Sequence, residues 1–193
     1  ARMPRTASKT RWLTLAVALV LGMLACQGAL AQKVRLATSV GEVVIQLDAD
    51  KAPKTVANFV QYVKDGHYDG LVFHRVIAAF MIQGGGFDPD MKERPTRAAI
   101  PLESRNGLNN VRGTVAMART NVPDSATAQF FINVVDNAFL DAANARDGNG
   151  YAVFGKVVSG MDVVDKIREV PVGNKAGHQN VPVQPVVIRK ATL

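Results

Sequence analysis

The sequence predicts a mainly β fold made of antiparallel strands and two helices. Many short runs of β-branched and aromatic residues are separated by glycine, proline and polar residues, which is the pattern of strands and turns. Only two segments show helical periodicity, whereas a parallel sheet needs a helix at nearly every crossover. A closed barrel would remove exposed sheet edges, but the pattern alone leaves a barrel and a sandwich open.

The first elements expected after residue 31 are the two arms of a hairpin. Residues 33–38 form one arm and residues 42–47 the other, with Gly41 near the turn. In the second arm, apolar residues alternate with other types, which predicts burial of Val43, Ile45 and Leu47.

The clearest predicted helix spans Pro53–Lys64. Pro53 fits the first turn, where its missing N–H costs nothing, and Asp50 is expected to cap or nearly cap the helix. Gly66 is expected to end it. Apolar residues at helical spacing predict one buried stripe, made of Val56, Phe59, Val60 and Val63.

The rest of the chain is expected to contain a long surface loop, a second helix and six more strands. Residues 88–110 contain three prolines and are expected to form a surface loop. Loops of this length usually contribute to a functional site. A second helix is expected over residues 160–170, burying Val163, Val164, Ile167 and Val170. The other strands are expected at residues 72–77, 80–83, 113–118, 129–134, 151–158 and 183–190.

Composition describes an ordinary globular chain of 193 residues, 48% hydrophobic and 20% charged. Its net charge of +7 owes four charges to the first eleven residues, and the rest carries only +3. Because that remainder is small and the two signs are interspersed, we expect no nucleic-acid binding.

The N-terminus predicts a cleavable Sec-type signal peptide over residues 1–31. Basic residues precede the uncharged segment 12–25, and residues 29–31 read Ala-Leu-Ala, so cleavage would leave Gln32 first. The uncharged run is short for a membrane span. We therefore expect a periplasmic domain, residues 32–193, without stable membrane association. Acylation at Cys26, the only cysteine, is the minor alternative; after cleavage at residue 31 no disulfide is available.

A group of polar and apolar residues in neighbouring predicted strands suggests a binding surface. Met81 and Gln83 are two residues apart, and so are Gln129 and Phe131, so each pair shares one face of its strand. Together the two strands could line a pocket with an apolar floor and a polar rim, with Arg75 beside it.

Several separated motifs resemble the cyclophilin family of peptidyl-prolyl cis-trans isomerases, most closely its periplasmic bacterial members. They are Phe-His-Arg-Val-Ile at 73–77, Phe-Met-Ile-Gln-Gly-Gly at 80–85, Met-Ala at 117–118, Gln-Phe-Phe-Ile at 129–132, Phe-Leu-Asp at 139–141 and Val-Phe-Gly-Lys-Val at 153–157. The resemblance covers residues 34–193. It implies a closed eight-stranded antiparallel β-barrel with two capping α-helices, and catalysis of Xaa-Pro isomerisation in exported polypeptides without a cofactor.

The resemblance also implies the roles of the site residues. Arg75 would be the catalytic arginine and Gln83 its polar partner. Ala118 and Arg119 would meet the substrate backbone, and Gln129 would help to position it. The proline pocket would be formed by Phe80, Met81, Phe131 and Leu140, and its rim by His74, Phe139 and Tyr151.

This chain departs from common family patterns at four places. Phe139 stands where many eukaryotic members have tryptophan, so we expect weak cyclosporin binding without loss of activity. Tyr151 replaces a frequent histidine at the rim, and Arg119 replaces a frequent asparagine. Residues 142–149 are longer than the usual connection, which could change access near Tyr151.

The sequence gives less support to other functions. The three histidines, His67, His74 and His178, lack metal-site spacing, and the glycines at 84–86 lack the lysine of a phosphate loop. The serious rival is a module that binds proline-containing peptides or unfolded proteins without depending on isomerisation. Arg75 favours catalysis, because binding a planar Xaa-Pro bond scarcely needs it. We expect a monomer.

Overall fold

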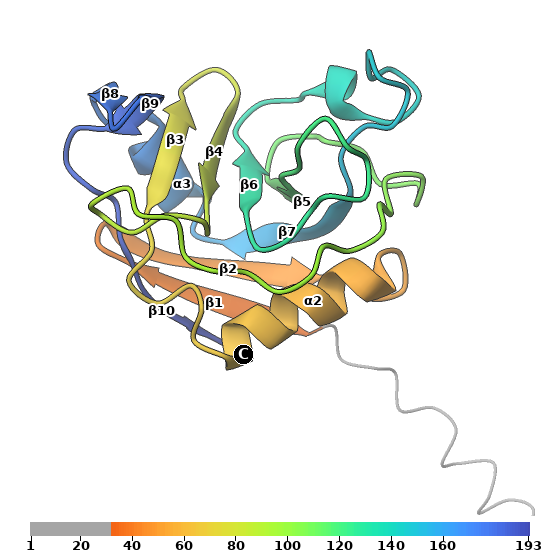
Figure 1. Cartoon of the computed structure of the whole chain (residues 1–193), viewed down its shortest axis with the longest axis horizontal. Helices are drawn as coiled ribbons and strands as arrows, with labels where there is room; N and C mark the ends of the chain where they lie inside the picture. The colour runs from red at the N-terminus through yellow and green to blue at the C-terminus, as the bar shows by residue number, and fades with distance from the viewer. Residues whose placement is uncertain (1–31) are drawn as a thin grey trace, which may run out of the picture. The chain divides into compact units, whose positions relative to one another are not determined.

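The computed structural model describes residues 32–193, so the predicted signal peptide and Cys26 lie outside the described residues. Its main feature is an antiparallel sheet of eight strands, in the order β10-β1-β2-β7-β5-β6-β4-β3 (Figure 1). The strands are β1 (Lys33–Thr38), β2 (Gly41–Leu47), β3 (Phe73–Ile77), β4 (Met81–Gly84), β5 (Thr114–Met117), β6 (Phe130–Asn133), β7 (Val153–Ser159) and β10 (Ile188–Thr192).

Residues just before β3 and β10 bring the two outer strands together. The Phe73 N–H donates to the Val186 carbonyl at 3.0 Å, and the Ile188 N–H donates to the Leu71 carbonyl at 2.8 Å. An isolated antiparallel bridge joins Val72 to Val187 between them. The sheet is therefore a nearly closed barrel, which confirms the predicted fold class and leaves few unpaired edges.

Helix α2 (Pro53–Lys64) packs its predicted apolar stripe into the barrel core, and Phe59 is fully buried. The Phe59 ring lies 5.0 to 5.4 Å from the rings of Tyr68, Phe130 and Phe154. The prediction that Asp50 caps this helix is wrong. The N-cap position is Ala52, which has no side-chain acceptor.

Glu103 supplies the missing acceptor for α2. Its carboxylate accepts the backbone N–H groups of Lys54 at 3.1 Å and Thr55 at 2.8 Å, together with the Thr55 hydroxyl at 2.7 Å. Glu103 lies in segment 88–110, which is irregular, as predicted. The long loop is thus held to the scaffold by satisfying the helix N-terminus.

Helix α3 (Met161–Arg168) buries Val163, Val164 and Ile167 as predicted. The prediction for Val170 is only partly right, because this residue follows the helix and is half-buried. No helix among the described residues is both long and apolar enough to cross a bilayer.

The C-terminal part contains the largest errors of prediction. The last strand was expected at 183–190 but begins at Ile188, because Pro185 has no N–H for a ladder and Val183 is exposed. A short hairpin, β8 (Val172–Lys175) and β9 (His178–Pro182), was not predicted. Every residue of β8 is exposed, so no alternation of buried residues marks it.

Strand alternation creates two separate apolar clusters. Ile82 and Ile132 are cross-strand partners that point into the barrel core and are fully buried. The neighbouring residues point the other way and form a second cluster outside the barrel, made of Met81, Ala116, Phe131, Leu140 and Val153. This outer cluster is the base of the site.

Candidate active site

A pocket of about 350 Å³ lies over the outer cluster. Its floor is apolar: Met81, Phe131 and Leu140 are at most 7% exposed. Ten of the twelve residues predicted for the site line it, namely Arg75, Phe80, Met81, Gln83, Ala118, Arg119, Phe131, Phe139, Leu140 and Tyr151. The structure therefore brings together residues that are far apart in the sequence, and it places an arginine at the edge of an apolar pocket.

His74 and Gln129, the other two predicted residues, line a neighbouring pocket that also includes Arg75 and Gln83. The two pockets thus meet at this arginine and this glutamine. The predicted set is divided between two adjoining spaces, rather than arranged around a single one.

The walls of the first pocket are aromatic pairs. The ring of Tyr151 meets that of Phe131 edge-on, with centroids 5.7 Å apart. The rings of Phe80 and Phe139 are 5.5 Å apart, and Phe139 is 57% exposed. Phe139 and Leu140 belong to a short 3-10 helix, η1 (Ala138–Leu140), that was not predicted. Such rings present flat apolar surface with little conformational freedom.

A row of polar side chains crosses β3, β4 and the residue just before β6. Arg75 lies opposite Gln83 in the β3–β4 ladder, and its guanidinium donates to Gln83 Oε1 at 3.3 Å. Gln83 Nε2 in turn donates to Gln129 Oε1 at 3.0 Å. None of the ion pairs among residues 32–193 involves Arg75. The guanidinium is therefore positioned by amides and retains its full charge for a ligand.

The Arg119 side chain is almost completely buried, at 2% exposed, and is occupied by the protein itself. It donates to the carbonyls of Gly150 and Thr120, both at 2.9 Å, and forms an ion pair with Asp147. Its guanidinium also lies over the Tyr151 ring, 4.6 Å from the centroid. Although Arg119 lines the pocket, its charged end fastens the segment 142–150 and supports Tyr151.

The Arg119 guanidinium and two backbone N–H groups, those of Asn149 and Gly150, lower the pKa of Asp147 to about 2. Gly150 has φ of +66°, and a Cβ there would lie 2.5 Å from the Ala142 nitrogen. Glycine is thus required where this segment closes on itself. These contacts hold residues 142–149 next to the pocket. The length of this segment in the sequence could not show where it would lie.

Three buried asparagines support the pocket and were missed by sequence reasoning. Asn137 Nδ2 donates to the Phe80 carbonyl at 2.9 Å and to Asn133 Oδ1 at 2.8 Å, and Asn133 Nδ2 donates to Asn110 Oδ1 at 3.2 Å. All three are at most 2% exposed. The network ties η1 to the turn that carries Phe80. The one available signal was a polar Asn133 in an otherwise apolar strand.

His74 is buried at 4% exposed and packs against Phe87, with ring centroids 4.7 Å apart. Burial, reinforced by the nearby His178 and Arg75, lowers the pKa of His74 to about 4. The imidazole is therefore neutral at ordinary pH. Its Nδ1 atom is buried and has no hydrogen-bond partner within residues 32–193.

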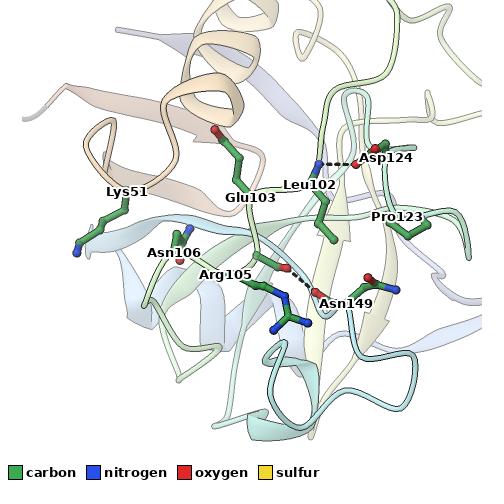
Figure 2. A pocket seen from close by; sticks show the side chains of 9 residues that line it. Lys51, Leu102, Glu103, Arg105, Asn106, Pro123, Asp124 and Asn149 are labelled. Atoms are coloured by element: carbon green, nitrogen blue, oxygen red, sulfur yellow. Dashed lines mark hydrogen bonds between the residues drawn. The ribbon is translucent and has the colours of Figure 1, made fainter.

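A larger pocket, about 480 Å³, lies elsewhere, beside the N-terminus of α2 (Figure 2). Its two carboxylates already have structural partners. Glu103 caps α2, and Asp124 accepts the Leu102 N–H at 2.8 Å, as Figure 2 shows. Within residues 32–193, no group of three or more histidines, cysteines or acidic residues could hold a metal ion. We assign no chemistry to this pocket.

A nearly closed antiparallel barrel with two helices, and an apolar pocket on its outer face beside an arginine held by a glutamine, define the cyclophilin class. The chain belongs to this family, because residues 33–193 match the family described as cyclophilin type peptidyl-prolyl cis-trans isomerase. This confirms the resemblance drawn from the motifs.

The relatives agree. The chain is 60% identical over 161 residues to peptidyl-prolyl cis-trans isomerase cyp18 of Streptomyces antibioticus, covering 83% of this chain and 97% of the relative. It is 55% identical over 157 residues to peptidyl-prolyl cis-trans isomerase B of Escherichia coli K12, covering 81% and 96%. The protein is thus a peptidyl-prolyl cis-trans isomerase.

A similar solved structure is that of a Cryptosporidium parvum cyclophilin type peptidyl-prolyl cis-trans isomerase in the presence of the dipeptide Ala-Pro. It is 25% identical, has a TM-score of 0.72, and the match covers 84% of this chain and 98% of that one.

Proposed function

We propose that this isomerase acts on Xaa-Pro bonds of exported polypeptides and assists their folding, with Arg75 as the catalytic residue. The observation that carries the catalytic part is the placement of the Arg75 guanidinium at the rim of an apolar pocket. It is held there by Gln83 and has no ion-pair partner within residues 32–193. The pocket binds the proline ring, and the arginine acts on the bond that precedes it.

The chemistry of the bond explains why these groups suffice. Rotation about a peptide bond is resisted by resonance, with a barrier of about 18–20 kcal/mol, so an Xaa-Pro bond isomerises unaided over tens to hundreds of seconds. At the twisted midpoint the nitrogen lone pair is no longer delocalised and accepts a hydrogen bond. A donor aimed at that nitrogen stabilises the transition state more than either planar state.

Arg75 needs the pocket to reach a large rate enhancement. One charged hydrogen bond contributes about 1.5–3 kcal/mol, and each 1.36 kcal/mol gives about tenfold in rate. The arginine thus accounts for about 10- to 100-fold. The rest comes from holding the ring against Phe80, Met81, Phe131 and Leu140, so that the preceding carbonyl turns while water is excluded.

The other site residues have supporting roles. Gln83 and Gln129 orient Arg75 and meet the substrate backbone, together with Ala118 at the pocket edge. The structure of a similar isomerase obtained in the presence of Ala-Pro supports the proposal that this chain binds proline-containing peptides. The expectation of weak cyclosporin binding stays a prediction, and rests on Phe139.

The exported location rests on the sequence pattern of residues 1–31. We propose cleavage after Ala31 and a mature domain of residues 32–193 in the periplasm. Cell fractionation and the mass of the mature protein test this directly. A periplasmic species beginning at Gln32 supports it, whereas a diacylated species beginning at Cys26 or a cytoplasmic uncleaved chain would refute it.

The rival function is a binding module for proline-containing segments, since the same pocket would serve it. A protease-coupled assay on a short Xaa-Pro peptide, comparing wild type with Arg75→Ala, separates the two. We expect the arginine variant to lose most of its rate. Equal rates would show that Arg75 is not catalytic, and the binding module would then be the better account of the site.

A further inference from the structure

We propose that the pocket adjoining the proline site is a second subsite of the peptide groove, which binds the acidic side chain of a substrate residue flanking the Xaa-Pro pair. The inference rests on the proposed function. This pocket has a volume of about 470 Å³ and is lined by His74, Arg75, Gln83, Phe87, Gln129, Gly177, His178, Gln179 and Asn180.

Its location is the first argument. Arg75 and Gln83 line both pockets, so a peptide whose proline occupies the first pocket passes them to reach the second. One wall comes from β3 and β4 of the barrel. The opposite wall is the β8–β9 hairpin, which packs beside β3 and stands apart from the eight-stranded sheet (Figure 1).

The chemistry of the lining is the second argument. The lining offers a guanidinium, two imidazoles and four carboxamides, and no aspartate or glutamate is among the lining residues. Gln129 accepts the bond from Gln83 through its oxygen, so its –NH2 group remains to donate. A carboxylate is the side chain that such a set of donors binds best. Because the Arg75 guanidinium has five N–H donors, N–H groups on its pocket side can bind that carboxylate while another is directed at the Xaa-Pro nitrogen.

The third argument is that the pocket has a rigid aromatic wall. Phe87 packs between two imidazoles, with ring centroids 4.7 Å from His74 and 4.9 Å from His178. His74 is only 4% exposed, so this wall is fixed to the barrel and holds His178 beside the pocket.

The β8–β9 hairpin divides its surface between the barrel and the pocket. Strand β8 is entirely exposed, whereas β9 buries Val181 and Pro182 and packs beside β3. Residues 177–180, at the turn and the start of β9, line the pocket instead. His178 lies in this lining segment and packs on Phe87, so it is the specificity residue of the hairpin.

The test is a set of Xaa-Pro peptides carrying Glu, Gln or Lys at each of the two positions before and after the pair, with kcat/KM measured by NMR exchange. For wild type we expect Glu to exceed Gln by about fivefold at one position, with Lys below Gln, as for a half-exposed ion pair. His178→Glu should invert this order. Asn174→Ala, on the exposed strand of the same hairpin, should leave it unchanged.

Two outcomes would overturn the proposal and leave the isomerase function intact. They are equal rates for the three peptides at every position in wild type, and a preference for Glu that persists unchanged in His178→Glu. A neutral peptide, with alanine at all flanking positions, tests the isomerase function separately from the acidic subsite. If wild type fails to isomerise that peptide, the proposed function falls and the subsite falls with it.

Discussion

Arg75 and Gln83 face each other across the β3–β4 ladder, and one guanidinium N–H donates to the Gln83 amide oxygen at 3.3 Å. Because Gln83 donates onward to Gln129, the amide cannot rotate freely. The guanidinium therefore has a fixed direction without a carboxylate to neutralise it. A neutral orienting partner suits a cation whose charge is needed by the substrate.

The first prediction concerns Phe80, which lines the proline pocket and packs on Phe139. We expect Phe80→Ala to lower kcat/KM by roughly tenfold or more, because burial of a Phe surface against the ligand contributes about 1.5–3 kcal/mol. Stopped-flow measurement of Xaa-Pro isomerisation checks this. Phe131→Ala should impair turnover too, but it also costs about 3–5 kcal/mol of stability. Wild-type turnover in Phe80→Ala would mean that the pocket is misassigned.

A second prediction concerns the ion pair between Arg119 and Asp147. The pKa of Asp147 is about 2 in the folded protein, below the ordinary value of about 3.9. The stabilisation of the segment is therefore complete above about pH 4 and is lost as the pH falls toward 2. Carboxyl NMR shifts should show Asp147 titrating near pH 2, and the amide chemical shift of Gly150, which donates to this carboxylate, should change over the same pH range. In Arg119→Lys we expect the midpoint to move upward; an unmoved midpoint would contradict this cause.

The same ion pair should affect catalysis through Tyr151. We expect Asp147→Asn to lower kcat/KM by up to about fivefold, as for a partly exposed ion pair. Most of the change should be in KM, because Tyr151 is a wall of the pocket and not a reacting group. Steady-state kinetics on one Xaa-Pro peptide measures the split, and a fall confined to kcat would argue against a positioning role.

His74 predicts a pH dependence of stability. Its pKa is about 4 in the folded protein, against about 6.5 when unfolded, so the unfolded chain binds more protons between these values. Stability should be complete above about pH 6.5 and should fall by about 3 kcal/mol as the pH decreases to 4. Urea unfolding of wild type and His74→Leu measures this difference. Burial also lowers the pKa of His67, so a smaller dependence should remain in the variant.

Glu103 provides a prediction about the scaffold. Because its carboxylate satisfies the N-terminus of α2, Glu103→Ala should lower the free energy of unfolding by about 1–2 kcal/mol. Asp50→Ala is the matched control, since the structure does not use Asp50 as the cap, and it should stay within about 0.5 kcal/mol of wild type. The reverse ranking in denaturant titrations would refute this assignment.

Locally patterned elements could be predicted from the sequence. The alternation in β2 and the stripe of α2 report burial residue by residue, and the bounds of β1, β2 and α2 were predicted to within a residue. The β3–β4 pair was visible for the same reason. Strand alternation placed Met81 with Gln83 and Gln129 with Phe131, whereas the other residues that line the pocket were predicted only from the resemblance to the family.

What sequence reasoning missed depends on contacts between distant residues. Glu103 reaches α2 across 48 residues, and Arg119 reaches Asp147 across 28. No local pattern encodes either contact. The β8–β9 hairpin buries too little to leave a periodic signal, and Asn137 looks like an ordinary loop residue until its partners are placed around it.

The central claim is that Arg75 acts on the twisted bond and not on the bound planar peptide. Exchange NMR on a saturating Xaa-Pro peptide gives both the affinity and the interconversion rate in one sample, for wild type and for Arg75→Ala. We predict an affinity changed by less than about threefold and an interconversion rate lowered by about 10- to 100-fold. An unchanged interconversion rate, with or without loss of affinity, would contradict the claim.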